Sequence, residues 1–126
     1  MKNEKFEEDI RVVPELFDKL KIIETGEESI LKGELPIIDA DNKLWDTYQI
    51  EIKGSDLYPF GFPKLFEIAN AFPKNADWHV YENDESCCID VLPNEIILCK
   101  NGLNVIDYIN RFAVPYFANQ SFRIRE

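Results

Sequence analysis

The sequence predicts one α+β domain, in which an N-terminal helix, a four-stranded antiparallel meander, an irregular loop and a C-terminal helix follow one another. Apolar residues recur at helical spacing near both ends of the chain, and short β-like runs separated by turn residues lie between them. These turns are too short for parallel crossovers, which need a dozen or more residues. The chain has 126 residues, of which 45% are hydrophobic, and this is enough for one core but not for two full domains.

The first helix is expected within residues 3–20. Its apolar residues fall on one helical stripe, formed by Phe6, Ile10, Val13, Leu16, Phe17 and Leu20. Pro14 interrupts the stripe, and an interior proline removes a backbone hydrogen bond and clashes with the preceding turn. We therefore expect either a kink or two short helices, with Pro14 near the start of the second.

Three β-like runs follow the first helix, at residues 19–24, 29–38 and 45–53. In the third run, Tyr48, Ile50 and Ile52 share one face, and mostly polar side chains share the other. This alternation is typical of an antiparallel sheet with one covered face.

The remaining segments are a rigid loop, a fourth strand, a long irregular stretch and the last helix. Residues 58–63 cannot be helical, because each of their two prolines pushes the preceding residue into an extended conformation. A strand is expected at 64–68, and residues 69–93 form an irregular stretch of the kind that is usually functional. Apolar spacing over residues 103–113 indicates a helix, to which residues 115–122 add another turn or two.

Charge and composition exclude several functions. A formal net charge of −10 repels phosphate backbones, so no nucleic-acid partner is expected and a charged partner should be basic. No segment has the roughly 20 apolar residues that cross a bilayer, and the N-terminus lacks a signal-peptide centre, so we expect no membrane association and a cytoplasmic location. Three cysteines and one histidine give neither a disulfide framework nor a zinc spacing, so reduced thiols and no metal or cofactor are expected.

The adjacent cysteines Cys87 and Cys88 are the main chemical signal. Free cysteines are commonly buried and behave as small apolar groups, which is the default interpretation. However, a polar segment at residues 81–86 leads into the pair, and reactive thiols need access to solvent. Cys99 lies in an apolar run and is expected in the core.

Two strings, SDLYPFGFPKLFEI and WHVYENDESCCIDVL, resemble the centre of a ubiquitin-conjugating enzyme (UBC-like) domain. That family has a Tyr-Pro-Phe-x-Pro-Pro-Lys loop, a strand, a His-Pro-Asn tripeptide and Cys-Leu-Asp-Ile-Leu around the catalytic thiol. The matching residues are Tyr58, Pro59, Phe60, Pro63 and Lys64 in the loop, His79 in the tripeptide, and Cys88, Ile89, Asp90, Val91 and Leu92 in the last string. The order of the expected elements is also similar to that of the family.

The sequence departs from the common pattern of this family in several places. Val80 and Tyr81 stand where the proline and asparagine of the tripeptide would be, and the stretch from His79 to Cys88 is one residue shorter. No tryptophan follows the cysteine string, and the region after Gly102 is too short for the full set of C-terminal helices. These features resemble the divergent bacterial members found in antiphage operons. In the CBASS branch of these operons, the conjugated protein is a cGAS-like nucleotidyltransferase rather than ubiquitin.

The resemblance implies an acyltransferase with a cysteine thioester intermediate. Cys88 would attack the activated C-terminal carbonyl of a partner protein, either a cGAS-like nucleotidyltransferase or a ubiquitin-like protein, and pass the acyl group to an amine. Nearby acidic residues would raise the pKa of the thiol, so we expect a restrained nucleophile. The resemblance also suggests that a carboxylate beside the cysteine orients or deprotonates the incoming lysine, and Asp90 and Glu85 are the nearest candidates.

Three further residues each have two or more interpretations. Neighbouring residues of an extended segment point to opposite faces, so Cys87 is either a buried filler or a second thiol that accepts, relays or resolves the acyl group; a strained vicinal disulfide is a third alternative. His79 is either a hydrogen-bonded loop anchor, as in the resembled family, or a general base. Tyr81 either replaces the missing asparagine as a donor near the thioester carbonyl or packs under the loop.

Two rival functions also fit the sequence. One is a catalytically inactive binding or adaptor module of the same fold, which the lost Pro-Asn pair favours. The other is an unrelated cysteine hydrolase, which would need His79 within hydrogen-bond reach of a sulfur atom.

Overall fold

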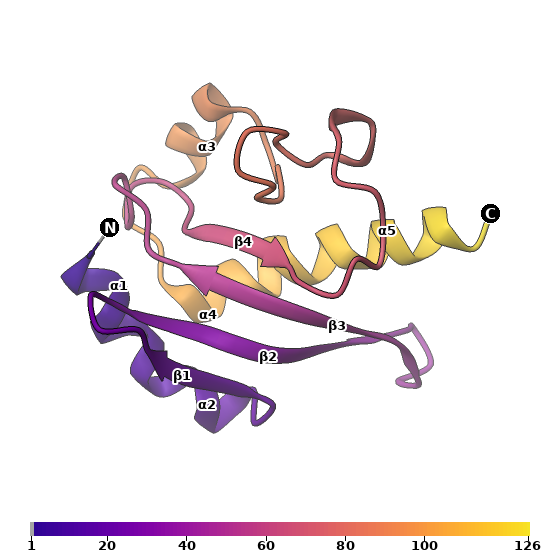
Figure 1. Cartoon of the computed structure of the whole chain (residues 1–126), viewed down its shortest axis with the longest axis horizontal. Helices are drawn as coiled ribbons and strands as arrows, with labels where there is room; N and C mark the ends of the chain where they lie inside the picture. The colour runs from indigo at the N-terminus through magenta and orange to yellow at the C-terminus, as the bar shows by residue number, and fades with distance from the viewer. Residues whose placement is uncertain (1) are drawn as a thin grey trace.

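Four antiparallel strands form the centre of the computed structural model, which describes residues 2–126 (Figure 1). The strands are β1 (Leu20–Glu24), β2 (Ser29–Ile38), β3 (Leu44–Lys53) and β4 (Lys64–Glu67), and they neighbour one another in chain order. Each strand pairs antiparallel with the next. The predicted meander is therefore confirmed, with boundaries that differ from the expected ones by no more than one residue.

The N-terminal segment forms two short helices joined by a 3₁₀ turn. These are α1 (Glu4–Asp9), the turn Ile10–Val12 and α2 (Val13–Leu16). The Asn3 side chain caps α1 by accepting the N–H of Phe6 at 3.0 Å, and Pro14 lies in the first turn of α2. The break predicted from the proline is thus confirmed, because Pro14 begins a helix where its missing N–H costs nothing.

The core lies between the covered face of the sheet and the helices. Tyr48, Ile50 and Ile52 are buried, as the alternation in β3 predicts, and the Tyr48 ring stacks on Phe117 with the ring centroids 4.6 Å apart. The Tyr48 hydroxyl also lies 2.6 Å from the Ser121 hydroxyl. These contacts fix the last helix across β2 and β3 (Figure 1).

The C-terminal helix is continuous across the two segments in which the sequence predicts it. It runs from α4 (Val105–Tyr108) through a π-helical turn (Ile109–Ala113) into α5 (Val114–Ile124). The turn or two of helix expected over residues 115–122 is confirmed, and the helix extends two residues further, to Ile124. The π turn directly before α5 widens the backbone where Pro115 lacks an N–H, so the helix passes the proline and continues to Ile124.

One helix, α3 (Leu92–Leu98), was not expected. It begins at the end of the stretch predicted to be irregular. The rest of that stretch is irregular apart from a 3₁₀ turn at Ala76–Trp78 and an isolated bridge between Val80 and Cys87. None of the α3 residues is buried, so its apolar side chains do not form the buried stripe that marks a helix in sequence. Cys99, directly after α3, is buried as predicted.

The expected loop at residues 58–63 is confirmed, and it contacts both the N-terminal helix and the segment before α4. The Tyr58 hydroxyl donates to the Asp9 carboxylate in α1, and the Pro59 carbonyl accepts the N–H of Leu103 at 2.8 Å. Within residues 2–126, no helix is both long enough and apolar enough to cross a membrane.

Candidate active site

A short hairpin presents the two cysteines. Val80 and Cys87 pair as an antiparallel bridge, and the N–H of Tyr81 donates to the Ser86 carbonyl at 2.9 Å. The N–H of Cys88 closes the hairpin by donating to the His79 carbonyl at 2.8 Å. The N–H of Cys87 donates to the Leu65 carbonyl at 2.7 Å, which attaches the hairpin to β4. The position of both thiols is therefore set by the edge of the sheet.

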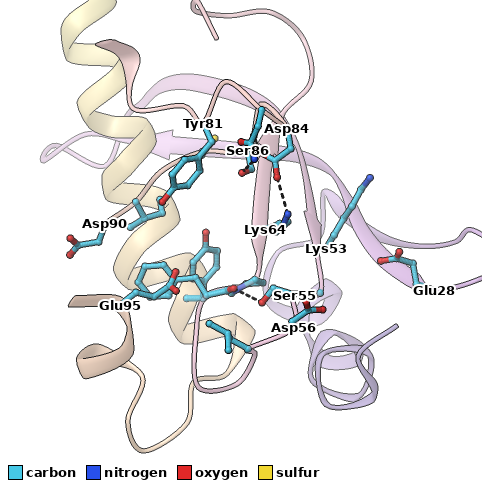
Figure 2. Close-up of a pocket in the computed structure, with 18 residues that line it drawn as sticks. Glu28, Lys53, Ser55, Asp56, Lys64, Tyr81, Asp84, Ser86, Asp90 and Glu95 are labelled. Carbon is cyan, nitrogen blue, oxygen red and sulfur yellow. Dashed lines mark hydrogen bonds and ion pairs between the residues drawn. The ribbon is translucent and has the colours of Figure 1, made fainter. Parts of the chain in front are cut away.

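The two thiols lie on opposite sides of this segment. Cys87 is only 7% exposed and borders a cleft of about 760 Å³, between the hairpin, the loop at 58–63 and α3. Figure 2 shows this cleft, with Tyr81, Asp84 and Ser86 on its hairpin side. Cys88 is half-buried and lines a separate cleft of about 500 Å³, beside the C-terminal helix. A reagent in the second cleft therefore meets Cys88 and not Cys87.

The chemical state of Cys87 follows from its burial. Removal from water raises the pKa of the Cys87 thiol to about 12, and the hydrogen bond with Tyr116 and the charge of Lys74 offset only part of that rise. Because the thiolate is the nucleophilic form, this raised pKa makes Cys87 a poor nucleophile at neutral pH.

Tyr81 is a neighbour of the Cys88 sulfur. A hydrogen bond between the Tyr81 hydroxyl and Cys88, together with partial burial, raises the pKa of Tyr81 to about 12. The phenol therefore keeps its proton at neutral pH and is a hydrogen-bond donor next to the sulfur. The Cys88 thiol itself donates to the Asp90 carbonyl oxygen at 3.6 Å.

The carboxylates of Asp84 and Asp90, two acidic residues near Cys88, are already bound to other residues of the chain. The Asp84 carboxylate binds Lys64 at 2.8 Å and accepts the N–H and hydroxyl of Ser86 (Figure 2). Partial burial acts to raise the pKa of Asp84, but these hydrogen bonds outweigh it and lower the pKa to about 2.

The Asp90 carboxylate is also hydrogen-bonded, to residues at the start of α3. It accepts the N–H of Val91 and the side-chain amide of Asn94, both at 2.8 Å, which fixes the first turn of α3. Glu82 and Glu85 are exposed on the hairpin. The structure thus brings Cys88, Asp90 and His79 to the same cleft, although the Asp90 contact to the thiol is made by its backbone carbonyl. Tyr81 lines the other cleft.

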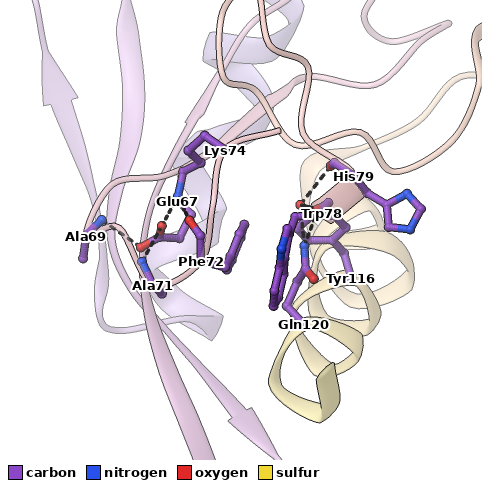
Figure 3. A network of polar contacts seen from close by, with 9 residues as sticks. All are labelled: Glu67, Ala69, Ala71, Phe72, Lys74, Trp78, His79, Tyr116 and Gln120. Carbon is purple, nitrogen blue, oxygen red and sulfur yellow. Dashed lines mark hydrogen bonds and ion pairs between the residues drawn. The ribbon is translucent and has the colours of Figure 1, made fainter. Parts of the chain in front are cut away.

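His79 anchors the hairpin through its backbone. It adopts a left-handed conformation, with φ 57° and ψ 50°, and its carbonyl oxygen accepts both the N–H of Cys88 and the hydroxyl of Tyr116, the latter at 3.0 Å. Gln120 supports this turn by donating to the Trp78 carbonyl at 2.7 Å and to the Tyr116 oxygen at 2.9 Å (Figure 3). The imidazole of His79 is exposed, and within residues 2–126 no hydrogen bond joins it to a thiol.

A buried ion pair lies on the other side of Trp78 and Phe72 (Figure 3). The Glu67 side chain is fully buried and accepts the N–H groups of Ala69 and Ala71, at 2.7 and 3.0 Å, as well as the Lys74 ammonium. Sequence reasoning missed this pair. The available signal was that Glu67 has the same parity in β4 as the buried Leu65 and must therefore point inward.

The cleft beside Cys88 contains two arginines that sequence reasoning also missed. Arg111 and Arg123 line it together with Asn119 and Gln120. Arg123 lies 4.0 Å from the centre of the Trp78 ring. These residues come from the C-terminal helix and meet Cys88 only through the tertiary fold, so no local pattern indicates them.

Comparison of the chain with protein-family profiles, with curated proteins and with solved structures finds no match in any of the three. Within residues 2–126, no group of three or more histidine, cysteine or acidic side chains is arranged to hold a metal ion.

Proposed function

We propose that this chain is a divergent bacterial relative of the ubiquitin-conjugating enzymes that carries an acyl group on Cys88. The observation on which the proposal depends most is the placement of the three thiols. Cys88 is half-buried in an open cleft, whereas Cys87 and Cys99 are buried. The order of the elements, from the N-terminal helix through the meander to the cysteine hairpin, also supports it.

The proposed reaction has two steps. The Cys88 thiolate attacks the activated C-terminal carbonyl of a partner protein, the bond to the activating group breaks, and a thioester forms. An amine then attacks the thioester carbonyl, the carbon–sulfur bond breaks, the thiolate leaves and the amine loses a proton to the solvent. The Tyr81 hydroxyl, which keeps its proton at neutral pH, is the donor for the negative charge that develops on the carbonyl oxygen in both steps.

The partner is proposed to be a protein with a free C-terminal tail. From the resemblance of the sequence, we infer a cGAS-like nucleotidyltransferase or a ubiquitin-like protein, conjugated in the cytoplasm as part of antiphage defence. Neither nucleic acid nor a membrane has a role in this proposal. A chain with a net charge of −10 has little attraction for a phosphate backbone.

Two observations bear on the rival functions. A cysteine hydrolase needs a histidine hydrogen-bonded to its thiol, and the His79 imidazole makes no such bond within residues 2–126. An inactive adaptor module is favoured by Val80 and Tyr81, which replace the Pro-Asn pair. The adaptor would keep the fold and bind its partner without forming a thioester.

Thioester exchange with a synthetic peptide separates these functions without the natural activating enzyme. The protein is incubated with a peptide thioester of a small thiol, and the intact mass is measured under nonreducing conditions. We expect one acyl group per chain, removed by dithiothreitol, present in Cys87→Ala and absent from Cys88→Ala. Loading that survives in Cys88→Ala, or no loading at all, would overturn the proposal.

A further inference from the structure

The cleft beside Cys88 carries positive charge in a strongly acidic protein. The chain has 24 acidic residues against 14 lysines and arginines, yet the charged side chains that line this cleft are Arg111, Arg123 and Asp90. The Asp90 carboxylate binds Val91 and Asn94 at the start of α3. The cleft therefore differs in sign from the molecule as a whole.

The two arginines are in different states. Arg123 pairs with Asp77 at 2.7 Å and stacks on Trp78, so its charge is already partly compensated. Arg111 stacks on Phe112, with its guanidinium 5.0 Å from the ring centre, and within residues 2–126 no carboxylate lies within ion-pair distance of it. Stacking holds the guanidinium in place but leaves its charge and its donors available.

The rest of the lining suits a peptide. Phe112, Pro115 and Ile89 supply apolar surface, and Asn119 supplies an amide that can donate to and accept from a peptide backbone. The amide of Gln120 is already used by Trp78 and Tyr116. Arg111 is thus the one cation lining the cleft, within residues 2–126, that lacks a carboxylate partner of its own.

We propose that the Cys88 cleft selects acyl tails that carry a carboxylate side chain close to the reacting C-terminus, and that Arg111 binds this carboxylate. The proposal deepens the function proposed above and rests on it. A guanidinium matches a carboxylate with two parallel hydrogen bonds, and this geometry favours it over an amide or an ammonium group.

The first test measures how fast Cys88 is loaded by three peptide thioesters that differ at one position. The peptides end in Asp-Gly-Gly, Asn-Gly-Gly and Lys-Gly-Gly. A partly exposed ion pair contributes about 0.5–1 kcal/mol, so we expect the aspartate peptide to load about two- to five-fold faster than the asparagine peptide, and the lysine peptide to load slowest. Arg111→Gln should remove the preference and Arg111→Lys should retain part of it. Equal rates in the unaltered protein would overturn the proposal.

The second test detects the anion site without any acyl transfer. In a Cys87→Ala, Cys99→Ala background, the Cys88 thiolate attacks one sulfur of an aromatic disulfide, forms a mixed disulfide and releases one aromatic thiolate, which is followed by its absorbance. Dithiobis(nitrobenzoate) carries two carboxylates, whereas dithiodipyridine is neutral. We expect Arg111→Gln to slow the anionic reagent about two- to five-fold and to leave the neutral one unchanged.

The controls separate the two proposals. Arg11 is an exposed arginine in the N-terminal 3₁₀ turn, so Arg11→Gln removes the same charge without touching the cleft and should change neither rate. If Arg111→Gln slows both reagents equally, or neither, the anion site is absent. If no peptide thioester loads Cys88 but Arg111→Gln slows only the anionic reagent, the result contradicts the acyl carrier function and supports the anion site.

Discussion

The Tyr116 hydroxyl donates a hydrogen bond to the His79 carbonyl oxygen at 3.0 Å, and the same oxygen accepts the N–H of Cys88. This contact joins the C-terminal helix to the first residue of the cysteine hairpin, across 37 positions of sequence. The orientation of the Cys88 backbone is therefore set from two sides: by the hairpin itself and by α5. In the proposed function, Tyr116 is a positioning residue for the thiol.

Tyr116→Phe should loosen the hairpin at Cys88. The change removes the hydroxyl that binds His79 and Gln120, and a buried hydrogen bond is worth about 1 kcal/mol. Local opening that becomes easier by that amount corresponds to about five-fold faster exchange of the Cys88 amide hydrogen. Hydrogen exchange followed by mass spectrometry or NMR measures this effect.

Tyr48→Phe is the matched control for this prediction. It removes a similar buried hydroxyl contact, to Ser121 at 2.6 Å, outside the hairpin. We expect a comparable loss in the free energy of unfolding, without faster exchange at Cys88. Equal exchange in the two variants would mean that Tyr116 contributes only general stability.

Alkylation should distinguish the three thiols. Cys87, with its pKa raised to about 12, and the buried Cys99 should be protected in the folded protein, whereas Cys88 lies open in its cleft. We expect iodoacetamide at pH 8 to add one group per chain, mapped to Cys88 by mass spectrometry. Cys88→Ser should lose the fast phase, and all three thiols should react in urea. Fast modification of Cys87 in the folded Cys88→Ser protein would contradict this placement.

The Asp84–Lys64 contact predicts a specific pH dependence of stability. The pKa of Asp84 is lowered from 3.8 to about 2, so its contribution to stability is fully present above about pH 4 and is lost as the pH falls through about 2. Asp84→Asn should cost about 1 kcal/mol at pH 7, because the pair is partly exposed. By pH 3 the difference between the two proteins should be roughly half as large.

Urea titrations at pH 7 and pH 3 measure this difference. Glu27→Gln, in the exposed turn between β1 and β2, removes a carboxylate of no structural role in the described residues and serves as the control. A cost of Asp84→Asn that does not change between the two pH values would show that Asp84 acts through its shape rather than through its charge.

The buried pair of Glu67 and Lys74 should be far more sensitive than a surface pair. Glu67→Gln leaves the Lys74 ammonium, which is largely buried, without its counter-ion and should destabilise the protein by about 3 kcal/mol. In contrast, Glu51→Gln weakens two partly exposed contacts, to Lys32 at 3.5 Å and to Lys53 at 3.7 Å, and should cost less than about 1 kcal/mol. Thermal unfolding of the two variants compares the costs directly, and similar values would be evidence against a buried charge at position 67.

The features that could be predicted from the sequence are those that depend on a few neighbouring residues. Pro14 predicts the break between α1 and α2, because proline is tolerated in the first turn of a helix but not in its interior. The alternation of side chains in β3 identifies the covered face of the sheet. The helix α3 escaped prediction because Ile96 and Ile97 face solvent, so the spacing that marks a buried helix is missing.

The residues that surround the candidate site could not be predicted from local sequence patterns, for a different reason. The contact of Tyr116 with His79 and the approach of Arg111 to the Cys88 cleft join residues that are distant in sequence. Parity along an extended segment places Cys87 and Cys88 on opposite sides, but it does not say which of the two lines the cleft beside the C-terminal helix. Only the packing of the C-terminal helix against the hairpin decides that.

The most direct test of acyl transfer by Cys88 is to measure what happens to an acyl group once it is attached to this thiol. Protein loaded from a peptide thioester is freed of excess peptide and mixed with increasing concentrations of free lysine, and the products are followed by mass spectrometry. We predict that lysine accelerates unloading in proportion to its concentration and that the peptide appears as its lysine amide. Release of the free peptide acid at a rate independent of lysine would contradict acyl transfer and would instead indicate a thiol hydrolase.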